Sequence, residues 1–79
     1  MQYYRVIMAG GLQLDVDEHE LALIRATAAA ALSGEATPII SVMVSGADGS
    51  STKGPMINVL QVVAIDDLPA AETPRSDGR

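Results

Sequence analysis

The longest apolar run of the chain, residues 56–65, constrains the fold more than any other stretch, and it is rich in β-branched side chains. Side chains alternate between the two faces of a strand, so a strand here would be mostly apolar on both faces. Strands of that kind are covered on both sides. The sequence predicts only one helix, which can cover only one of the two faces of such a strand. The second cover must be a curled sheet or another copy of the protein. A helical turn over 57–60 before a short strand over 62–65 is the open alternative.

The composition leads to the same expectation. The chain has 79 residues and contains no Phe, Trp or Cys, so its core must be aliphatic. A domain this small buries only about 60% of the surface of its unfolded chain. Without Cys it has neither disulfides nor a Cys-based metal site. Self-association is the remaining common route to stability.

The acidic charge limits the partners that the chain can bind. The net charge is −5, and the cationic side chains of residues 1–65 are Arg5, Arg25 and Lys53. Binding to duplex nucleic acid depends on neutralising many phosphates, so we expect none. A small anion held by one or two cations is compatible with this charge. The sequence has no apolar run of transmembrane length and no signal-peptide pattern, which predicts a soluble, cytoplasmic protein without membrane contacts.

The first half of the chain predicts a hairpin followed by a helix. Residues 3–8 and 12–16 alternate as strands, and Gly10 and Gly11 supply the turn between them. Asp17 and Glu20 form a capping box, so a helix begins after Asp17 and runs to about residue 32. Gly34 ends the helix. The residues predicted to face the core are Leu21, Ile24, Ala28, Ala31 and Leu32.

The second half predicts two further strands and a tail. Residues 39–44 follow a proline and are nearly two-sided in their apolar character. Residues 45–55 are rich in Ser, Thr, Gly and Pro, which predicts a loop longer than most hairpin connections. The run 56–65 is the fourth strand. Residues 1–68 form one domain, and residues 69–79, without a large apolar side chain, predict a disordered tail.

The predicted fold class is therefore α+β, in the order ββαββ. One helix covers one face of a four-stranded antiparallel sheet, or of a small curled barrel. The opposite face would be an aggregation liability on a monomer, so we expect it to form an oligomer interface. The residues predicted for that interface are Ile39, Met43, Ile57 and Val59.

An anionic ligand is the second kind of partner that the residues suggest. Residues 46–54 combine glycines, hydroxyls and Lys53, the ingredients of a phosphate cradle. The spacing is not that of a phosphate-binding loop, and a strand follows it, so a flexible hairpin tip is the plainer interpretation. Two tyrosines beside Arg5 can stack on a planar ligand or close the core. The candidate ligand residues are Tyr4, Arg5, Ser50, Ser51, Thr52 and Lys53.

The residue inventory argues against a metal, a cofactor and catalysis. His19 is the only histidine, and its neighbouring carboxylates occupy adjacent helix positions, which do not face one another. A nucleophile needs a base and an orienting group within reach. One histidine in a helix cap does not supply both. We therefore expect a protein that is not an enzyme.

The assembled pattern resembles a loose class of short proteins found in phages and mobile elements. The residues that carry the resemblance are the strand Tyr4-Arg5-Val6, the glycine turn, the acidic helix cap, the helix end at Gly34 and the ending Ile57, Asn58, Val62 and Ile65. The long segment 45–55 departs from the pattern. Some small phage proteins of this size are oligomeric binders that block or absorb components of host defence, including nucleotide signals. By analogy, the resemblance implies a phage-encoded accessory or anti-defence protein in the host cytoplasm, and it transfers no site residue.

Two functional hypotheses follow. The first is a non-enzymatic, homo-oligomeric binding protein that acts through protein contacts. The alternative is an oligomer that sequesters a small anionic, nucleotide-like ligand at a subunit interface.

Overall fold

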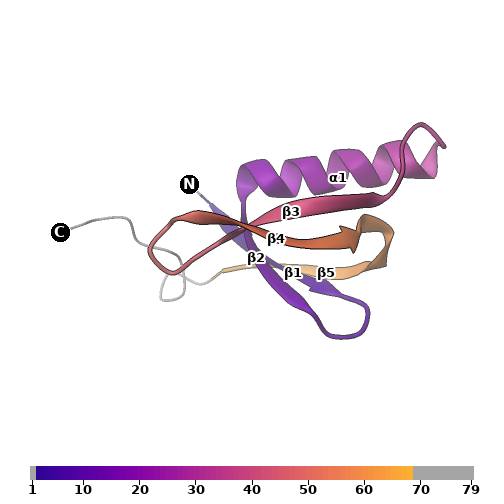
Figure 1. Ribbon diagram of the computed structural model, residues 1–79. Coiled ribbons are helices and arrows are strands. Elements are labelled where there is room, and N and C mark those ends of the chain that lie inside the picture. The colour runs from indigo at the N-terminus through magenta and orange to yellow at the C-terminus, as the bar shows by residue number, and fades with distance from the viewer. Residues whose placement is uncertain (1, 69–79) are drawn as a thin grey trace.

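The computed structural model describes residues 2–68, which form five strands, one α-helix and one 3₁₀ turn (Figure 1). The predicted class, α+β with one helix, is confirmed. The predicted tail over 69–79 lies outside the described residues. The elements in chain order are β1 (Tyr3–Met8), β2 (Gln13–Asp17), α1 (Glu18–Leu32), β3 (Ile39–Ser45), β4 (Ser51–Asn58), η1 (Val59–Gln61) and β5 (Val62–Asp67).

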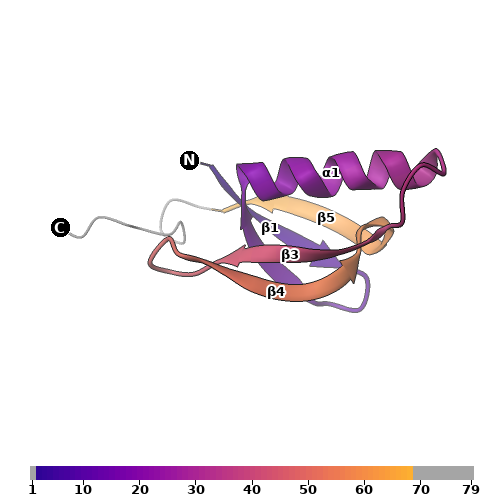
Figure 2. The same ribbon diagram turned by 45° about the horizontal axis from the view of Figure 1, so that its top comes forward.

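The strands form two antiparallel sheets, and the predicted single four-stranded sheet is wrong. One sheet has the order β2-β1-β5, and the other is the β3–β4 hairpin (Figure 2). Val6 lies at the centre of the first sheet, opposite Leu14 on β2 and Ile65 on β5. No ladder of hydrogen bonds joins the two sheets in the described part of the chain, so the strands do not close into a barrel.

The apolar run 56–65 is divided between the two sheets by the 3₁₀ turn. The Asn58 side-chain Oδ1 accepts a hydrogen bond from the Leu60 N–H at 2.9 Å. The Val59 N–H donates to the Pro38 carbonyl at 2.9 Å, which holds the end of the hairpin to the turn. An asparagine side chain that bonds the backbone two residues on favours a turn over a continued strand. The chain therefore changes direction here. A helical turn before a short strand is present as the alternative predicts, but it lies at 59–61, because residues 57 and 58 still belong to β4.

Half of the predicted loop 45–55 is a strand. Ser51–Asn58 pairs with β3, which leaves only residues 46–50 as the hairpin connection. Ser41 faces Met56 and Met43 faces Lys53, so Gly54 and Pro55 together oppose Val42 in a β-bulge.

A glycine is required at the bulge because the neighbouring strand lies very close. A Cβ on Gly54 would lie 2.9 Å from Val44 Cγ1 and 3.0 Å from the Val42 carbonyl oxygen. Distances under 3.0 Å are not seen for real Cβ atoms, so any larger residue at position 54 must displace its neighbours.

The helix begins and ends where the sequence predicts, but the predicted capping box is formed only by its Asp17 half, because the Glu20 carboxylate bonds the Met43 N–H instead. The Asp17 carboxylate accepts a hydrogen bond from the Glu20 N–H at 2.8 Å, and Glu18 and Glu20 lie in the first turn, where they complement the helix dipole. Gly34 has a φ of +80°, and the Glu35 N–H returns to the Ala30 carbonyl at 2.8 Å. This closing geometry needs a left-handed residue, which glycine adopts without strain.

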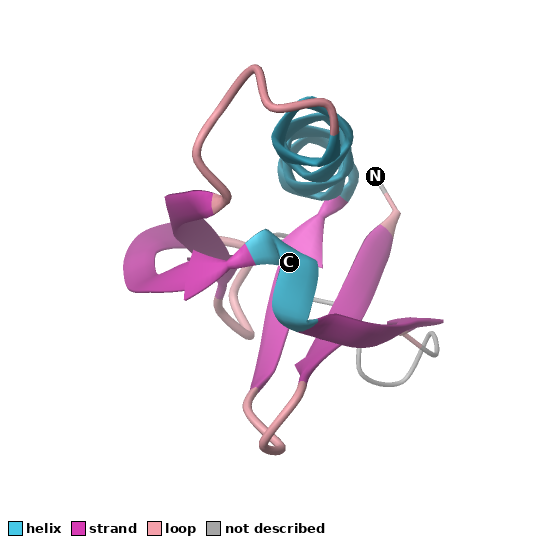
Figure 3. Cartoon of the chain, turned by 90° about the vertical axis from the view of Figure 1, so that its right-hand side faces the viewer, coloured by secondary structure: helices cyan, strands magenta, loops and turns pink. Residues whose placement is uncertain are grey.

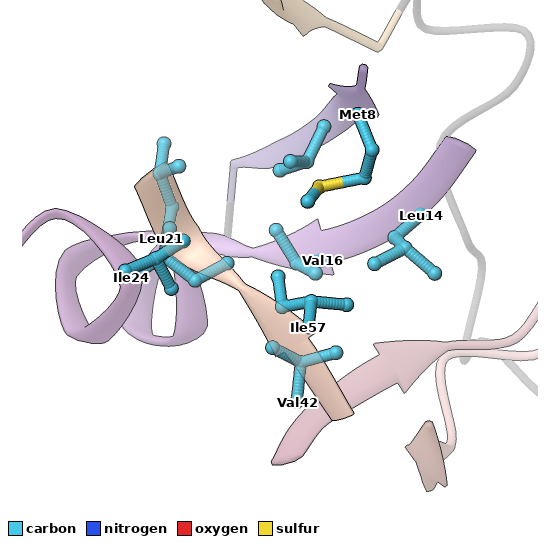
Figure 4. Close-up of a cluster of buried hydrophobic side chains, with 9 residues drawn as sticks. Met8, Leu14, Val16, Leu21, Ile24, Val42 and Ile57 are labelled. Atoms are coloured by element: carbon cyan, nitrogen blue, oxygen red, sulfur yellow. The ribbon is translucent and has the colours of Figure 1, made fainter. Parts of the chain in front are cut away.

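The core joins the helix to both sheets. Val6, Val16 and Val42 are fully buried, and Leu21 and Ile24 of α1 pack against them (Figure 4). Viewed along its axis, α1 lies above both sheets (Figure 3). The predicted inward positions Ala28 and Ala31 are half-buried, whereas Leu32 is 77% exposed and is a correction to the predicted core stripe. Leu32 lies on the side of the last helical turn that faces away from the core.

Candidate functional site

The outer face of the β3–β4 hairpin gathers several exposed apolar side chains. Cross-strand partners share a face, so the register places Ile39, Ser41, Met43 and Met56 together, on the side opposite the buried Val42. We call these four residues the hairpin face. The exposed fractions are 40% for Ile39, 41% for Met43 and 68% for Met56. Exposed apolar groups gathered in this way mark interaction sites more often than single exposed residues do.

The hairpin face has a protruding and a recessed part side by side. Met56 is directly opposite Ser41, and Ile39 and Met43 flank Ser41 on the same strand. The small serine is exposed between three larger apolar side chains. A small and a large side chain therefore alternate across one pair of strands, which favours a recess at Ser41 beside the larger Met56.

Two charged groups lie beside the hairpin face at the level of Met43. Lys53 is exposed and faces Met43 across the hairpin. On the other side of β3, the Glu20 carboxylate accepts a hydrogen bond from the Met43 N–H at 3.1 Å. This bond occupies a backbone donor at the strand edge, a common way of protecting an edge from unwanted strand pairing. Within residues 2–68, Arg5 and Asp15 form the one ion pair between side chains. Lys53 therefore forms no ion pair in this part of the chain.

The four predicted interface residues separate into two groups. Ile39 and Met43 are exposed on the hairpin face, as the alternation of β3 predicts. Ile57 and Val59 are 5% and 3% exposed and belong to the chain's own core. Ile57 and Met56 point to opposite faces of β4, and it is Met56, not Ile57, that lies on the hairpin face. The bulge at Gly54 and Pro55 is what places Met56 opposite Ser41.

The predicted ligand residues do not converge on one point. Tyr4 faces inward and packs against the core, whereas Arg5 lies on the outer face of its sheet. Ser51, Thr52 and Lys53 are consecutive residues of β4, so their side chains alternate between its two faces.

The hairpin tip uses its polar groups internally. The Asp48 carboxylate accepts hydrogen bonds from the Ser50 hydroxyl at 2.6 Å and from the Ser50 N–H at 2.9 Å. These bonds hold the pKa of Asp48 below its ordinary value of 3.8. The Gly46 N–H donates to the Ser50 carbonyl at 2.8 Å. A tip with these donors already engaged has few left to cradle a phosphate.

A depression of about 390 Å³ lies between the two sheets, next to Arg5. Arg5 Nε donates to Asp15 Oδ1 at 2.9 Å, and Arg5 Nη2 donates to Asp15 Oδ2 at 3.2 Å. This two-pronged bond matches the charge of the guanidinium with a carboxylate. The depression is lined by Arg5, Gln13, Leu14, Asp15, Val44 and Ser45.

Residues 2–68 contain neither a metal-binding cluster nor a membrane-spanning helix. No group of three or more His, Asp or Glu side chains is placed to hold a metal ion there. No helix in the same part of the chain is both long and apolar enough to span a bilayer.

Comparison with known proteins found no matching family model, curated protein or solved structure. The resemblance to short phage proteins therefore stays a prediction from the sequence.

Proposed function

We propose that this chain is a non-enzymatic binding protein that self-associates through the hairpin face. The observation that carries the proposal is the exposure of Met56, Met43 and Ile39 on one side of a single hairpin. The rest of the hairpin is already used, because Val42 and Ile57 on its inner side are buried in the core. The hairpin thus has apolar side chains on both faces, and the core of the chain covers only the inner one.

The exposure of Met56 sets the expected contribution of this side chain to the free energy of self-association. Burying a Met side chain completely stabilises by about 1.5–3 kcal/mol. Met56 is 68% exposed, so its burial in a symmetric dimer contributes on the order of 1.5 kcal/mol per chain. The two copies together contribute about 3 kcal/mol, which corresponds to roughly a hundredfold in Kd.

The test is sedimentation equilibrium of the wild-type chain and of two matched variants. Met56→Gln keeps the length of the side chain but makes it polar, and we expect it to weaken self-association about a hundredfold. Leu32→Gln is the control, because Leu32 is more exposed, at 77%, but lies on α1. Thermal unfolding of each variant shows that the fold is retained. A wild-type chain that stays monomeric at millimolar concentration contradicts the proposal, as does equal weakening by both variants.

The alternative of an anionic, nucleotide-like ligand has one supporting observation, the depression beside Arg5. Asp15 already matches the charge of Arg5, and Asp48 and Ser50 bond each other. We therefore place protein contacts first. Calorimetry against a panel of nucleotides tests the alternative, with Lys53→Ala as the variant that should weaken any binding observed.

A further inference from the structure

The self-association surface has a definite two-fold arrangement, and this inference rests on the proposed function. Where two copies pack by the same patch, each contact occurs twice, related by a two-fold axis. Stacked sheets keep their strands within about 30° of each other, at a distance of about 10 Å. Two hairpins that face each other can therefore be related by an axis parallel to the strands or by an axis across them.

The axis across the strands brings like groups together. Where this axis crosses the strands at the level of Met56 and Ser41, it places Met56 over the partner's Met56 and leaves Ser41 over the partner's Ser41. Two protruding side chains then meet, and two recesses face each other without being filled. Unfilled space at an interface forfeits dispersion contacts on both sides.

The axis parallel to the strands brings knob and hole together. Because Met56 and Ser41 are cross-strand partners, this rotation exchanges the two strands and places Met56 over the partner's Ser41. The same rotation places Lys53 over the partner's Met43, since Lys53 and Met43 are also cross-strand partners. The aliphatic stem of a lysine packs well on an apolar side chain while its charged end stays in water.

The charges beside the hairpin face favour the same arrangement. Glu20 lies on the far side of β3 at the level of Met43, whose N–H donates to it. A lysine laid along the partner's Met43 points its ammonium group toward the partner's Glu20. The exposed surface of the three-stranded sheet is less suited to self-contact. Asp15 and Asp66 lie on either side of Arg5 there, so two copies would bring several carboxylates together.

We propose that two copies of the chain pack their hairpin faces about a two-fold axis parallel to β3 and β4. Each Met56 fills the recess at the partner's Ser41, and each Lys53 pairs with the partner's Glu20. The occupant of the hairpin face is thus a second copy of this chain.

Cysteine crosslinking of the full chain tests the arrangement, because the natural chain has no cysteine. Ser41→Cys chains are mixed with tagged Met56→Cys chains and treated with a short bismaleimide. The expected product is the mixed 41-to-56 dimer, in at least fivefold excess over either like-with-like dimer. Ala26→Cys on the exposed side of α1 and Ala47→Cys at the hairpin tip are the controls, and both positions are exposed.

The outcomes separate the two proposals. A dimeric wild-type chain that crosslinks best through Ala26→Cys, or equally between like positions, overturns the arrangement and leaves self-association standing. A chain that is monomeric at every concentration overturns both.

Met56→Cys itself removes part of the proposed contact, so a second measurement tests the arrangement with Met56 intact. Glu20→Gln keeps an oxygen for the Met43 N–H and removes only the charge. Glu20→Gln and Lys53→Gln should each weaken the dimer by up to about fivefold at low salt, as exposed ion pairs do. The double variant should be no weaker than either single variant. Losses that simply multiply would show that Lys53 and Glu20 do not pair across the interface.

Discussion

Replacing Gly54 by alanine adds one methyl group at the point where β4 bulges against β3. That methyl would lie 2.9 Å from Val44 Cγ1, 3.0 Å from the Val42 carbonyl oxygen and 3.5 Å from Val42 Cγ2. Val42 is fully buried, so the neighbours can yield only by shifting the hairpin. Overpacking of this kind costs about 1–3 kcal/mol. A gain of about 0.4–1 kcal/mol offsets part of it, because alanine restricts the unfolded chain.

The net expectation for Gly54→Ala is a loss of about 1–2 kcal/mol in the free energy of unfolding. For a domain of this size, that lowers Tm by roughly 5–15 °C. The assay is thermal unfolding followed by circular dichroism, at one fixed protein concentration because self-association also shifts Tm.

Gly46→Ala is the matched control on the same hairpin. A Cβ on Gly46 would meet Asp48 Oδ1 and Ser50 Oγ at 3.3 Å, the ends of two side chains in the hairpin connection that can move aside. We expect a change within about 0.5 kcal/mol. If Gly54→Ala is as stable as the wild type, the close approach of β3 to the bulge is wrong, and so is the placement of Met56 opposite Ser41.

Three further predictions concern single interactions. Asp17→Ala removes the helix cap and should cost about 1 kcal/mol in chemical denaturation; an unchanged midpoint would mean that the cap does not stabilise the helix. Asp48 should titrate by NMR with a pKa below 3.8, and Ser50→Ala should raise it. The stabilisation from the hydrogen bonds between Ser50 and Asp48 is then fully present above pH 3.8 and is lost as the pH falls through the folded-state pKa of Asp48. An Asp48 titration midpoint at or above 3.8 would refute these hydrogen bonds. The Arg5–Asp15 pair has side chains about one-third exposed. A double-mutant cycle should therefore give a coupling energy below about 1 kcal/mol, and a larger one would show stronger burial than the structure has.

Local signals in the sequence were sufficient for the first half of the fold. The glycine turn, the alternation of β1 and β2, and the Asp17 cap each depend on residues within a few positions of one another. For that reason they can be predicted without knowing the tertiary structure. The structure retains all of them, including the helix end at Gly34.

The second half depends on partners that are distant in the sequence. Residues 51–55 have the composition of a loop, yet they form a strand because β3 provides a ladder for them. The turn at Val59 was detectable in principle from Asn58, whose side chain bonds the Leu60 N–H. Its apolar, β-branched neighbours favoured a continuous strand instead.

The candidate site could be predicted only in part, because one of its residues depends on strand pairing between residues distant in the sequence. Ile39 and Met43 follow from simple alternation along β3. Met56 follows only from the extra residue at the bulge, which shifts every side chain beyond it to the opposite face. Gly54 and Pro55 are residue types that mark a bulge within a strand, but the composition of residues 45–55 predicts a loop, so the strand that carries the bulge was not predicted.

Native mass spectrometry of the chain purified from cells without refolding tests the central claim most directly. Self-association through the hairpin face predicts a species of twice the 8.2 kDa chain mass, with no added mass, that Met56→Gln shifts to monomer. An oligomer carrying an extra few hundred daltons would instead support the sequestering alternative and give the mass of the ligand. A monomer at every concentration would contradict the account, because nothing would then cover the outer face of the hairpin.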